Sequence, residues 1–315
     1  MLAAVLIDVH QNIYRGLIMA VYVNTNVSSL NGRRYLNNVQ NSLTTTYQRL
    51  SSGLRINSAK DDAAGLQIAD RLTTQINGLN QGNRNTNDGI ALAQTIEGAL
   101  DETTNMLQKI RTLAVQSANG TNSAEDRKAL DTEAAALKAE ITRIAGQTKF
   151  GGKTVLDGAG AHSIYGTQAN GSKGGKLTLQ VGANNGDEVS FDVANFTFDG
   201  IYTAGAKNTA AFNAGNLILS TASGAKAVIS LMDSMIAVVD SQRSGLGAIQ
   251  NRLESSIRNQ SNVAANQSDA RSRIRDADFA EESANLSQQS IIQQAATSML
   301  MQANSRPQLA LSMLG

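Results

Sequence analysis

The sequence lacks several residue types on which active sites often depend. No cysteine occurs among its 315 residues, which excludes disulfides, thiolate nucleophiles and cysteine-bound metal. Tryptophan is absent, and aromatic residues make up 4% of the chain, fewer than enzymes usually place in cores and pockets. The formal net charge is +1, so no strong field attracts nucleic acid or anionic lipid. We therefore expect no nucleic-acid partner.

Long hydrophobic runs are also scarce. No segment approaches the roughly 20 apolar residues of a membrane span, so we predict no membrane insertion. The first residues, MLAAVLIDVHQNIYRGLI, lack a basic start, and their apolar run stops at Asp8. This pattern argues against a cleaved signal peptide. Met19 would make a sensible second start, so we regard residues 1–18 as a doubtful extension and leave Met1 and Met19 open as the true start.

Candidate chemical groups are few and isolated. The two histidines, His10 and His162, have no second member with which to form a triad or a two-histidine metal site. The glycine-rich stretches around residues 151–158 and 171–175 do not match GxxxxGK[ST], the spacing of a phosphate-binding loop. We therefore predict no enzyme, no catalytic residue, no metal site and no cofactor.

Helical periodicity dominates the front of the chain. Apolar residues recur at spacings of three and four up to Leu50, and the SSG of residues 51–53 then interrupts them. A second run extends from Ala69 to Ala114 and is longer than most helices of single domains, which favours a coiled coil or a filament rod. Ser123 and Asp126 have the spacing of a capping box, which predicts an antiparallel third helix.

The middle of the chain differs in composition and periodicity from both ends. Residues 176–193 alternate, turn at 184–187 and alternate back, which predicts a β-hairpin. Residues 158–175 and 196–216 are rich in Gly, Asn and Ala, and we predict that they form loops. Helical periodicity then resumes at Val228.

The last helices complete the fold prediction. One helical run continues to Val263, and another covers about 276–304. Because both ends are helical, the chain most simply folds back on itself. The expected fold is mainly α: a folded-back long-helix coiled-coil bundle formed by both chain ends, with a small β-hairpin and loop insertion in the middle.

The adjacent carboxylates Asp61 and Asp62 first suggest a catalytic or metal-binding pair. Ser58 precedes Asp61 by three residues, the spacing of a helix N-cap box. In this interpretation both carboxylates lie in the first helical turn, where the helix dipole stabilises each by about 0.3–1 kcal/mol. We therefore predict that they organise the chain and bind no metal.

Both ends of the chain resemble bacterial flagellin. The front carries NTNVSSLNGRRYLNN, RLSSGLRINSAKDDAAGLQIADRL and LQKIRTLAVQSANGTNS, and the back carries SRIRDADFAEESANL, IIQQAATSMLMQAN and LALSMLG. The stretch LSSGLRINSAKDDAAG is long and close to diagnostic of that family. The resemblance implies a structural subunit that self-polymerises into the extracellular flagellar filament and serves motility.

The resemblance also implies a division into domains. Residues 19–62 with 272–315 would form a terminal coiled-coil domain of the inner tube. Residues 63–195 with 217–271 would form the rod of the outer tube, including the hairpin. Little remains for the variable outer region of the family, about residues 196–216, so we expect a thin filament surface.

Three groups of site residues follow from the resemblance. The junction between inner and outer tube, expected to face neighbouring subunits, comprises Arg49, Arg55, Asn57, Lys60, Asp61 and Asp62. Recognition by Toll-like receptor 5 would use Lys109, Ile110, Leu113, Gln116 and Glu133, with Ile110 and Leu113 as rod core in the competing interpretation. The C-terminal assembly and chaperone segment would use Phe279, Leu286, Ile292, Met299, Leu309 and Leu314.

The implied partners are those of an exported filament subunit. They are other copies of the chain in a helical homopolymer, a flagellin-specific export chaperone, the flagellar type III export apparatus, and the filament cap and hook-associated junction proteins. Two alternatives remain open: a hook–filament junction protein of the same family, and a helical binding module that does not polymerise.

Overall fold

The computed structural model describes residues 25–158, 162–166, 174–205, 208–213 and 215–312. The chain divides into two compact units, one from residues 1–72 with 269–315 and the other from residues 73–268. The expected extension at residues 1–18 lies outside the described residues. The sequence prediction placed the domain limits near residues 62 and 272 instead, and that division stays a prediction.

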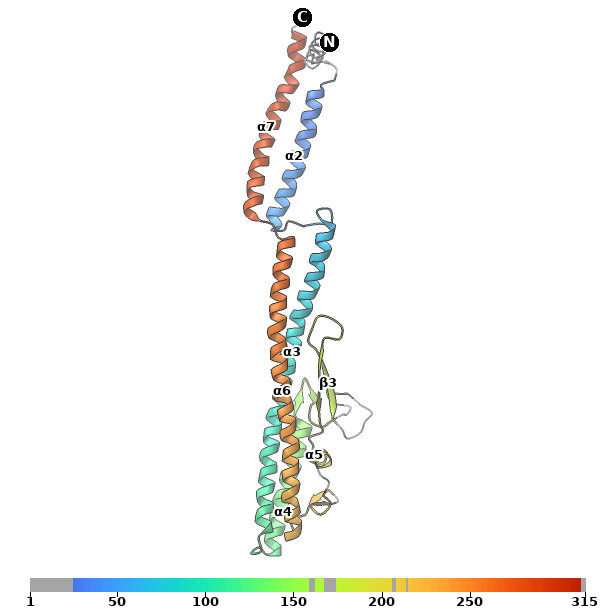
Figure 1. The fold of residues 1–315 in the computed structure, drawn as a ribbon, viewed down its shortest axis with the longest axis vertical. Coiled ribbons are helices and arrows are strands. Elements are labelled where there is room, and N and C mark those ends of the chain that lie inside the picture. The colour runs from blue at the N-terminus through green and yellow to red at the C-terminus, as the bar shows by residue number, and fades with distance from the viewer. Residues whose placement is uncertain (1–24, 159–161, 167–173, 206–207, 214, 313–315) are drawn as a thin grey trace, which may run out of the picture. The chain divides into compact units, whose positions relative to one another are not determined.

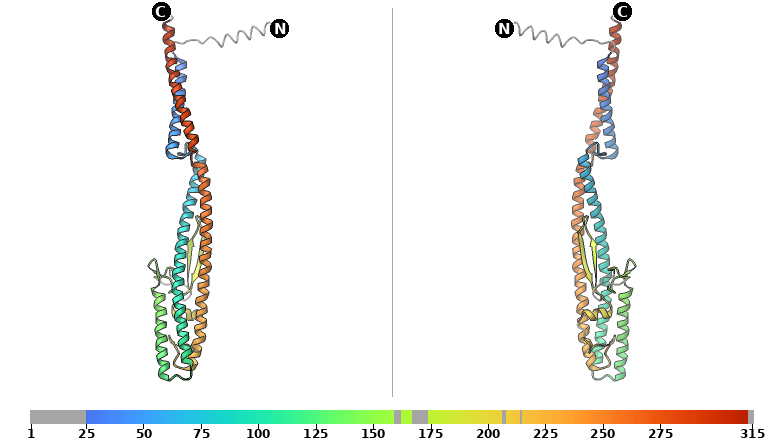
Figure 2. Two further views of the ribbon diagram at one scale, coloured as in Figure 1. Left: turned by 90° about the vertical axis from the view of Figure 1, so that its left-hand side faces the viewer. Right: turned by 90° about the vertical axis from the view of Figure 1, so that its right-hand side faces the viewer.

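The first unit is a pair of antiparallel helices from opposite ends of the chain. Helix α2 spans Val27–Ser52 and helix α7 spans Phe279–Ser312, and they lie side by side in both ribbon figures (Figures 1 and 2). Asn26 caps α2, and its side-chain amide donates to the carbonyl oxygen of Ala303 at 2.7 Å. The predicted meeting of the two chain ends is therefore confirmed.

The second unit is built on three long helices. Helix α3 spans Ala63–Ala118, α4 spans Ala124–Gln147 and α6 spans Ala222–Arg275, and the limits of the unit fall within α3 and α6. The predicted capping box at the start of α4 is present, because Ser123 and Asp126 each accept from the other's backbone N–H. Two hydrogen bonds from Arg127 to the carbonyl oxygens of Ser117 and Asn119 close the turn between α3 and α4.

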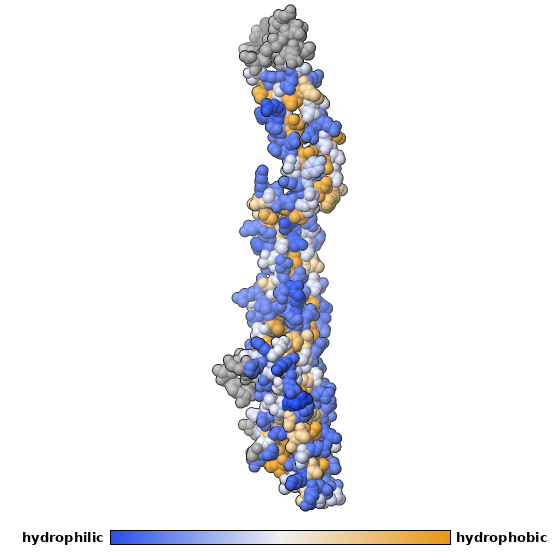
Figure 3. Space-filling view, turned by 180° about the vertical axis from the view of Figure 1, so that it is seen from behind, coloured by the Kyte–Doolittle hydropathy of each residue, from blue (hydrophilic) through white to orange (hydrophobic). Residues whose placement is uncertain are grey.

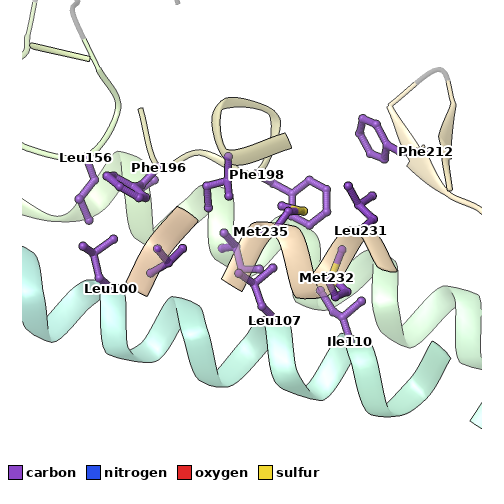
Figure 4. Close-up of a cluster of buried hydrophobic side chains, with 14 of the residues drawn as sticks. Leu100, Leu107, Ile110, Leu156, Phe196, Phe198, Phe212, Leu231, Met232 and Met235 are labelled. Atoms are coloured by element: carbon purple, nitrogen blue, oxygen red, sulfur yellow. The ribbon is translucent and has the colours of Figure 1, made fainter. Parts of the chain in front are cut away.

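One hydrophobic core joins these helices to the segment between α4 and α6 (Figure 4). Leu107 and Ile110 of α3 lie beside Met232 and Met235 of α6, and all four side chains are fully buried. The other main members are Leu100, Leu156, Phe196, Phe198, Ile201, Phe212 and Leu231. The helical spacings of three and four therefore direct one stripe of each long helix into a shared interior.

The predicted hairpin is confirmed. Strand β3 spans Gly175–Gln180 and pairs antiparallel with β4, which spans Glu188–Val193, in a register that sets Leu177 opposite Phe191. The turn lies against α3, where a side chain at Gly82 would come within 2.0 Å of the Val181 carbonyl oxygen. Only glycine allows this close approach.

The prediction of loops at residues 196–216 was wrong in part. Helix α5 spans Phe198–Ala204, and Phe196, Phe198, Ile201 and Phe212 are buried in the core. The remaining strands are two-residue ladders: β1 Lys149–Phe150 with β2 Lys153–Thr154, and β5 Phe212–Asn213 with β6 Asn216–Leu217.

The error arose because the aromatic residues of this segment are scattered among glycine and alanine, so its average composition resembles that of a loop. The ammonium group of Lys138 lies 5.8 Å from the ring centre of Phe198 and 5.2 Å from that of Phe212, and donates to the carbonyl oxygen of Gly215. Cation–π contact and core burial together hold a segment that its average composition suggests is irregular.

Helix α6 is more apolar than the sequence analysis expected of any segment. In the described part of the chain it is the one helix long and apolar enough to cross a membrane by length and composition. Its buried residues Val228, Leu231, Met232, Met235 and Val239 face the core of the second unit. Packing within the protein therefore accounts for the part of its apolar surface that these residues contribute.

Candidate interaction surfaces

The predicted junction begins where α2 ends. Gly53 terminates the helix in the left-handed conformation, with φ of 71°, and its N–H donates to the Arg49 carbonyl oxygen at 2.8 Å. A residue with a Cβ atom would be strained there, because this conformation is favourable mainly for glycine. The interruption that the SSG sequence predicts is thus a helix C-cap.

The chain then pairs with the linker that precedes α7. The N–H of Arg55 donates to the Arg275 carbonyl oxygen at 2.7 Å, and the N–H of Ala277 donates to the Gly53 carbonyl oxygen at 3.0 Å. Leu54 and Asp276 form an isolated antiparallel bridge between these contacts. The two linkers of the first unit are therefore fixed to each other by their backbones.

Arg55 contributes its side chain to the same connection. One guanidinium nitrogen donates to the Ile274 carbonyl oxygen at 2.5 Å. Ile56 follows and is 1% exposed, so its side chain anchors the linker from inside. Arg55 thus stabilises the fold of its own subunit. Its contact with neighbouring subunits stays a prediction.

Arg49 forms a largely buried ion pair that joins α2 to α7. Its Nη1 atom lies 3.0 Å from Oε1 of Glu282, whose side chain is 8% exposed. Neither Nε of Arg49 nor Oε2 of Glu282 has a hydrogen-bond partner among the described residues. A buried charge left without its partner is costly, so this pair favours one register of the two helices.

Glu282 was not among the residues selected from the sequence. It lies in the first turn of α7, directly after the exposed Glu281. The two neighbouring glutamates look equivalent in sequence, and only the position of Arg49 on α2 distinguishes them.

Asp61 closes a turn and does not lie in the first turn of α3. Its Oδ2 atom accepts from the backbone N–H groups of Asn57 and Ser58, at 3.2 and 2.9 Å, and from the Ser58 hydroxyl at 3.0 Å. The Ser58 backbone hydrogen bond, followed by that of the Ser58 hydroxyl, holds the pKa of the exposed Asp61 carboxyl below its usual range. These hydrogen bonds therefore stabilise the ionised carboxylate and close the turn.

Asp62, rather than Ser58, caps α3. Its Oδ1 atom accepts from the Gly65 N–H at 2.8 Å, and the helix begins at Ala63 without an acidic residue in its first turn. The predicted cap at Ser58 was therefore wrong by four residues. The error arises because Ser58-x-x-Asp61 also fits a closed turn that leads into the helix.

The two remaining junction residues differ in their hydrogen bonding. Asn57 donates to the Gln48 carbonyl oxygen and to the Ser52 hydroxyl, at 3.2 and 2.7 Å, and so binds the turn to the end of α2. Lys60 is exposed and has no hydrogen bond or ion pair within the described residues. Both line an open polar groove of about 940 Å³.

The expected receptor-contact residues separate into exposed and buried members. Lys109 and Glu133 are half-exposed and approach each other to 3.9 Å across α3 and α4, and Gln116 is exposed. Ile110 is 0% exposed and Leu113 is 5% exposed. The geometry therefore places these two in the core, as in the competing interpretation, and corrects their assignment as directly accessible contact positions.

The C-terminal segment presents hydrophobic side chains to the surface. Phe279 is 57% exposed and Met299 is 71% exposed, whereas Leu286 and Ile292 are half-buried. The side chain of Leu309 and the whole of Leu314 lie outside what the structure describes. This exposure is visible as hydrophobic patches among polar residues on the α2–α7 pair (Figure 3).

An apolar groove of about 1090 Å³ runs between α2 and α7. Gly32 and Tyr35 contribute from α2, and Ile292, Ala296 and Met299 contribute from α7. The groove is bounded on two sides only, so a third apolar element could fill it.

Two family models match this chain, one over its N-terminal part and one over its C-terminal part. Residues 23–161 match the family model described as bacterial flagellin N-terminal helical region, and residues 229–314 match the one described as bacterial flagellin C-terminal helical region. The chain is 39% identical to Flagellin B of Vibrio cholerae serotype O1 and 37% identical to Flagellin A of Vibrio anguillarum. Each match covers 94% of this chain and all of the relative.

A solved structure from Vibrio parahaemolyticus has a similar fold. It is a putative flagellar hook-associated protein, 17% identical, with a TM-score of 0.53 over 69% of this chain and all of that chain. At this identity the likeness concerns the fold alone.

Proposed function

The chain belongs to the bacterial flagellin family, structural proteins of the extracellular flagellar filament, and we propose that it self-polymerises into such a filament to support motility. The observation that carries the proposal is the open apolar surface of the α2–α7 pair. Exposed apolar residues lie along both helices: Val27, Leu30, Tyr35, Tyr47, Phe279, Ile291, Met299 and Met301. A surface of this kind marks a site of association.

The energetics of the pair favour assembly. On α2 the buried residues are Val39 and Thr46, and on α7 Ala296 is 6% exposed. Ordering each residue costs roughly 1–2 kcal/mol of backbone entropy, which a lone pair with so little burial does not offset. Neighbouring subunits would supply the missing contacts. We therefore expect the isolated subunit to be disordered at both ends and helical there after polymerisation.

Seeded growth tests the proposal directly. Purified chain is added to filament fragments and examined by electron microscopy, with far-UV circular dichroism recorded before and after growth. Helical tubes and a gain in helicity are expected. A chain lacking the last ~40 residues should retain the folded second unit and form no tubes, because those residues contain α7. Persistent monomers on seeds would overturn the proposal.

The abundance of the protein separates a filament subunit from a hook–filament junction protein. A filament subunit is the main component of filaments sheared from cells, whereas a junction protein is present in few copies. The family alignment extends over 376 positions, more than this chain's 315 residues, so the relatives carry residues that this chain lacks. This supports a thin outer region.

Among the junction residues, Lys60 is the strongest candidate for a contact between subunits. Its ammonium group is exposed and unengaged within the described residues, whereas Arg55 and Asp61 stabilise their own linker. Lys60→Ala is expected to slow seeded growth without changing the urea midpoint of the monomer. The expected effect of Arg55→Ala and of Asp61→Ala has the same direction: more damage to assembly than to monomer folding. Normal growth of all three variants would restrict this stretch to capping.

We also propose export through the flagellar type III apparatus, with a dedicated chaperone bound to residues 276–315 before export. The exposed side chains of Phe279 and Met299 offer apolar contacts that a chaperone would cover. Co-purification of the chain with the flagellar chaperone of the same bacterium tests this. Phe279→Asp with Met299→Asp should abolish the complex, whereas the matched polar-surface variant Gln288→Asp should retain it.

Recognition by Toll-like receptor 5 is a further proposed property of the second unit. The accessible surface there consists of Lys109, Gln116 and Glu133, together with Val115, which is 50% exposed. Glu133→Ala and Gln116→Ala should weaken activation of receptor-expressing cells, with unchanged unfolding of the monomer. Full activity of both variants would contradict the proposal.

A further inference from the structure

Methionine is the one sulfur-containing residue type of this chain. The sequence has eight methionines, no cysteine and no tryptophan. Peroxides and related two-electron oxidants attack the sulfur atoms of cysteine and methionine, at rates that follow the exposure of the sulfur. Because no thiol competes for such an oxidant here, the exposure of each methionine decides where the chain is oxidised.

The fold separates the described methionines into two groups. Met232 and Met235 of α6 are fully buried in the core of the second unit (Figure 4), and Met106 of α3 is partly buried against the same core. Met299 and Met301 of α7 are 71% and 67% exposed. Three further methionines lie outside the described residues: Met1, Met19 and Met313. Within the described residues, accessible sulfur is therefore concentrated on α7.

The two α7 methionines occupy different faces of their helix. Met299 lines the groove between α2 and α7, together with Tyr35, Ala295 and Ala296. Successive residues turn by about 100° around an α-helix, so Met301 points about 200° away from Met299. Both faces of this part of α7 therefore carry a large exposed apolar side chain that ends in an oxidisable sulfur atom.

Oxidation would change what these faces can pack against. A lone pair of the thioether sulfur attacks one oxygen of a peroxide, the S–O bond forms as the O–O bond breaks, and the other oxygen leaves as water after proton transfer. The sulfur is oxidised by two electrons and the peroxide is reduced by two. The sulfoxide that forms is polar where the thioether was apolar. Beside Ala295 and Ala296, whose side chains donate no hydrogen bond, its oxygen is costly to bury.

We propose that Met299 and Met301 form an oxidation site of the unassembled subunit, and that their sulfoxides block polymerisation until they are reduced. The oxidant is a peroxide or hypochlorous acid, and the reductant is a thiol-dependent methionine sulfoxide reductase. The second unit stays folded throughout, because Met232 and Met235 are shielded. The selectivity stands on the exposure of the sulfur atoms alone, whereas the effect on assembly rests on the proposed function.

Site-resolved oxidation of the dilute monomer tests the selectivity without any assembly step. The chain is treated with hydrogen peroxide, quenched with free methionine at intervals and examined by peptide mass spectrometry. Sulfoxide at Met299 and Met301 should form at least about tenfold faster than at Met232 and Met235, which react only when the core opens. In concentrated urea the four rates should become similar. Similar rates in the native monomer would overturn the proposal.

Seeded growth tests the effect on assembly. Monomer is oxidised until Met299 and Met301 are converted and Met232 and Met235 remain intact. It should then grow on filament fragments about tenfold more slowly than untreated monomer, because a polar group without a partner is costly to bury. Reductases for both sulfoxide epimers, with a thiol, should restore growth. The urea midpoint of the second unit should stay unchanged.

Matched variants assign the effect to α7. The double variant Met299→Leu with Met301→Leu keeps apolar side chains of similar volume and should grow equally well before and after peroxide treatment. Met106→Leu removes a methionine of the second unit and should remain as sensitive as the native chain. Met299→Gln and Met301→Gln place a polar group at each position and should each slow growth without any oxidant.

The outcomes separate this proposal from the proposed function. Failure of untreated monomer to grow would refute the proposed function and leave the oxidation rates standing as a test of selectivity. If untreated monomer grows, equal growth of the oxidised monomer would overturn the block. Loss of growth that reductase does not reverse, or that persists in the double leucine variant, would assign the damage to other residues and overturn the α7 site.

Discussion

The α2–α7 pair and the second unit are both built from long helices, but they bury very different fractions of their apolar side chains. In the second unit, α3, α4 and α6 share one core in which Leu107, Ile110 and Met235 are fully buried. In the pair, Ile291, Met299 and Met301 are each at least two-thirds exposed. The second unit therefore carries its stabilising contacts within one chain, whereas the pair depends on contacts from outside it.

Matched isoleucine substitutions should produce the largest difference between the two regions. Ile110→Ala removes a fully buried side chain and should lower the free energy of unfolding by about 2–5 kcal/mol. Ile291→Ala removes one that is 67% exposed and should leave monomer unfolding unchanged while slowing seeded growth. Urea unfolding of both variants checks the comparison, and similar losses of stability would refute it.

The ion pair within the first unit should have the next largest effect. Arg49→Met leaves the buried Glu282 carboxylate without its partner, which should cost about 1–3 kcal/mol of local stability. Arg33→Met, on the exposed surface of the same helix, is the matched control. Hydrogen exchange of α2 and α7 amides in filaments should show faster opening in Arg49→Met alone. Identical exchange in both variants would mean that the pair does not fix the helices.

Cap substitutions should give a smaller contrast. Ser123→Ala removes the hydroxyl that caps α4 and should lower global stability by about 1 kcal/mol. Ser58→Ala removes one of three hydrogen bonds to Asp61 in the first unit, so the urea midpoint of the second unit should not move. An equal shift in both variants would show that the two units unfold together.

Acidification should reveal the smallest difference. The backbone N–H of Ser123, followed by its hydroxyl, holds the pKa of Asp126 below its usual value of 3.8. Since the folded-state pKa is lower than the unfolded one, the stabilisation is complete above the unfolded pKa and is lost as pH falls through the folded pKa. Asp126→Asn should reduce the acid-dependent loss of second-unit stability below about pH 4. Glu125→Gln is the control, and an unchanged acid profile in Asp126→Asn would contradict this account.

The sequence predicted the regular elements better than the connections between them. The spacing of apolar residues was sufficient for α2, α3, α4 and the 176–193 hairpin, because helix and strand periods are local properties. The cap at Ser58 was misplaced, since a Ser-x-x-Asp spacing suits both a helix start and the turn that Asp61 closes. The core packing of Phe198 and Phe212 was missed, because it depends on Lys138 and on helices distant in sequence.

The candidate sites were also predicted incompletely, because their geometry depends on residues far apart in the sequence. Sequence resemblance selected Ile110 with Lys109, but only the packing of α3 separates a core position from an exposed one. It selected Arg49 without Glu282, because an ion pair between residues so far apart along the chain requires both helices in place.

By itself, the sequence determined a mainly helical chain with two matching ends, a hairpin between them and no thiol chemistry, because composition and periodicity are properties of the chain alone. Only the tertiary structure decided which apolar stripes are covered and which stay open. Burial depends on what lies opposite each stripe: α3 and α6 meet a full core, while α2 and α7 have only each other and an unfilled groove.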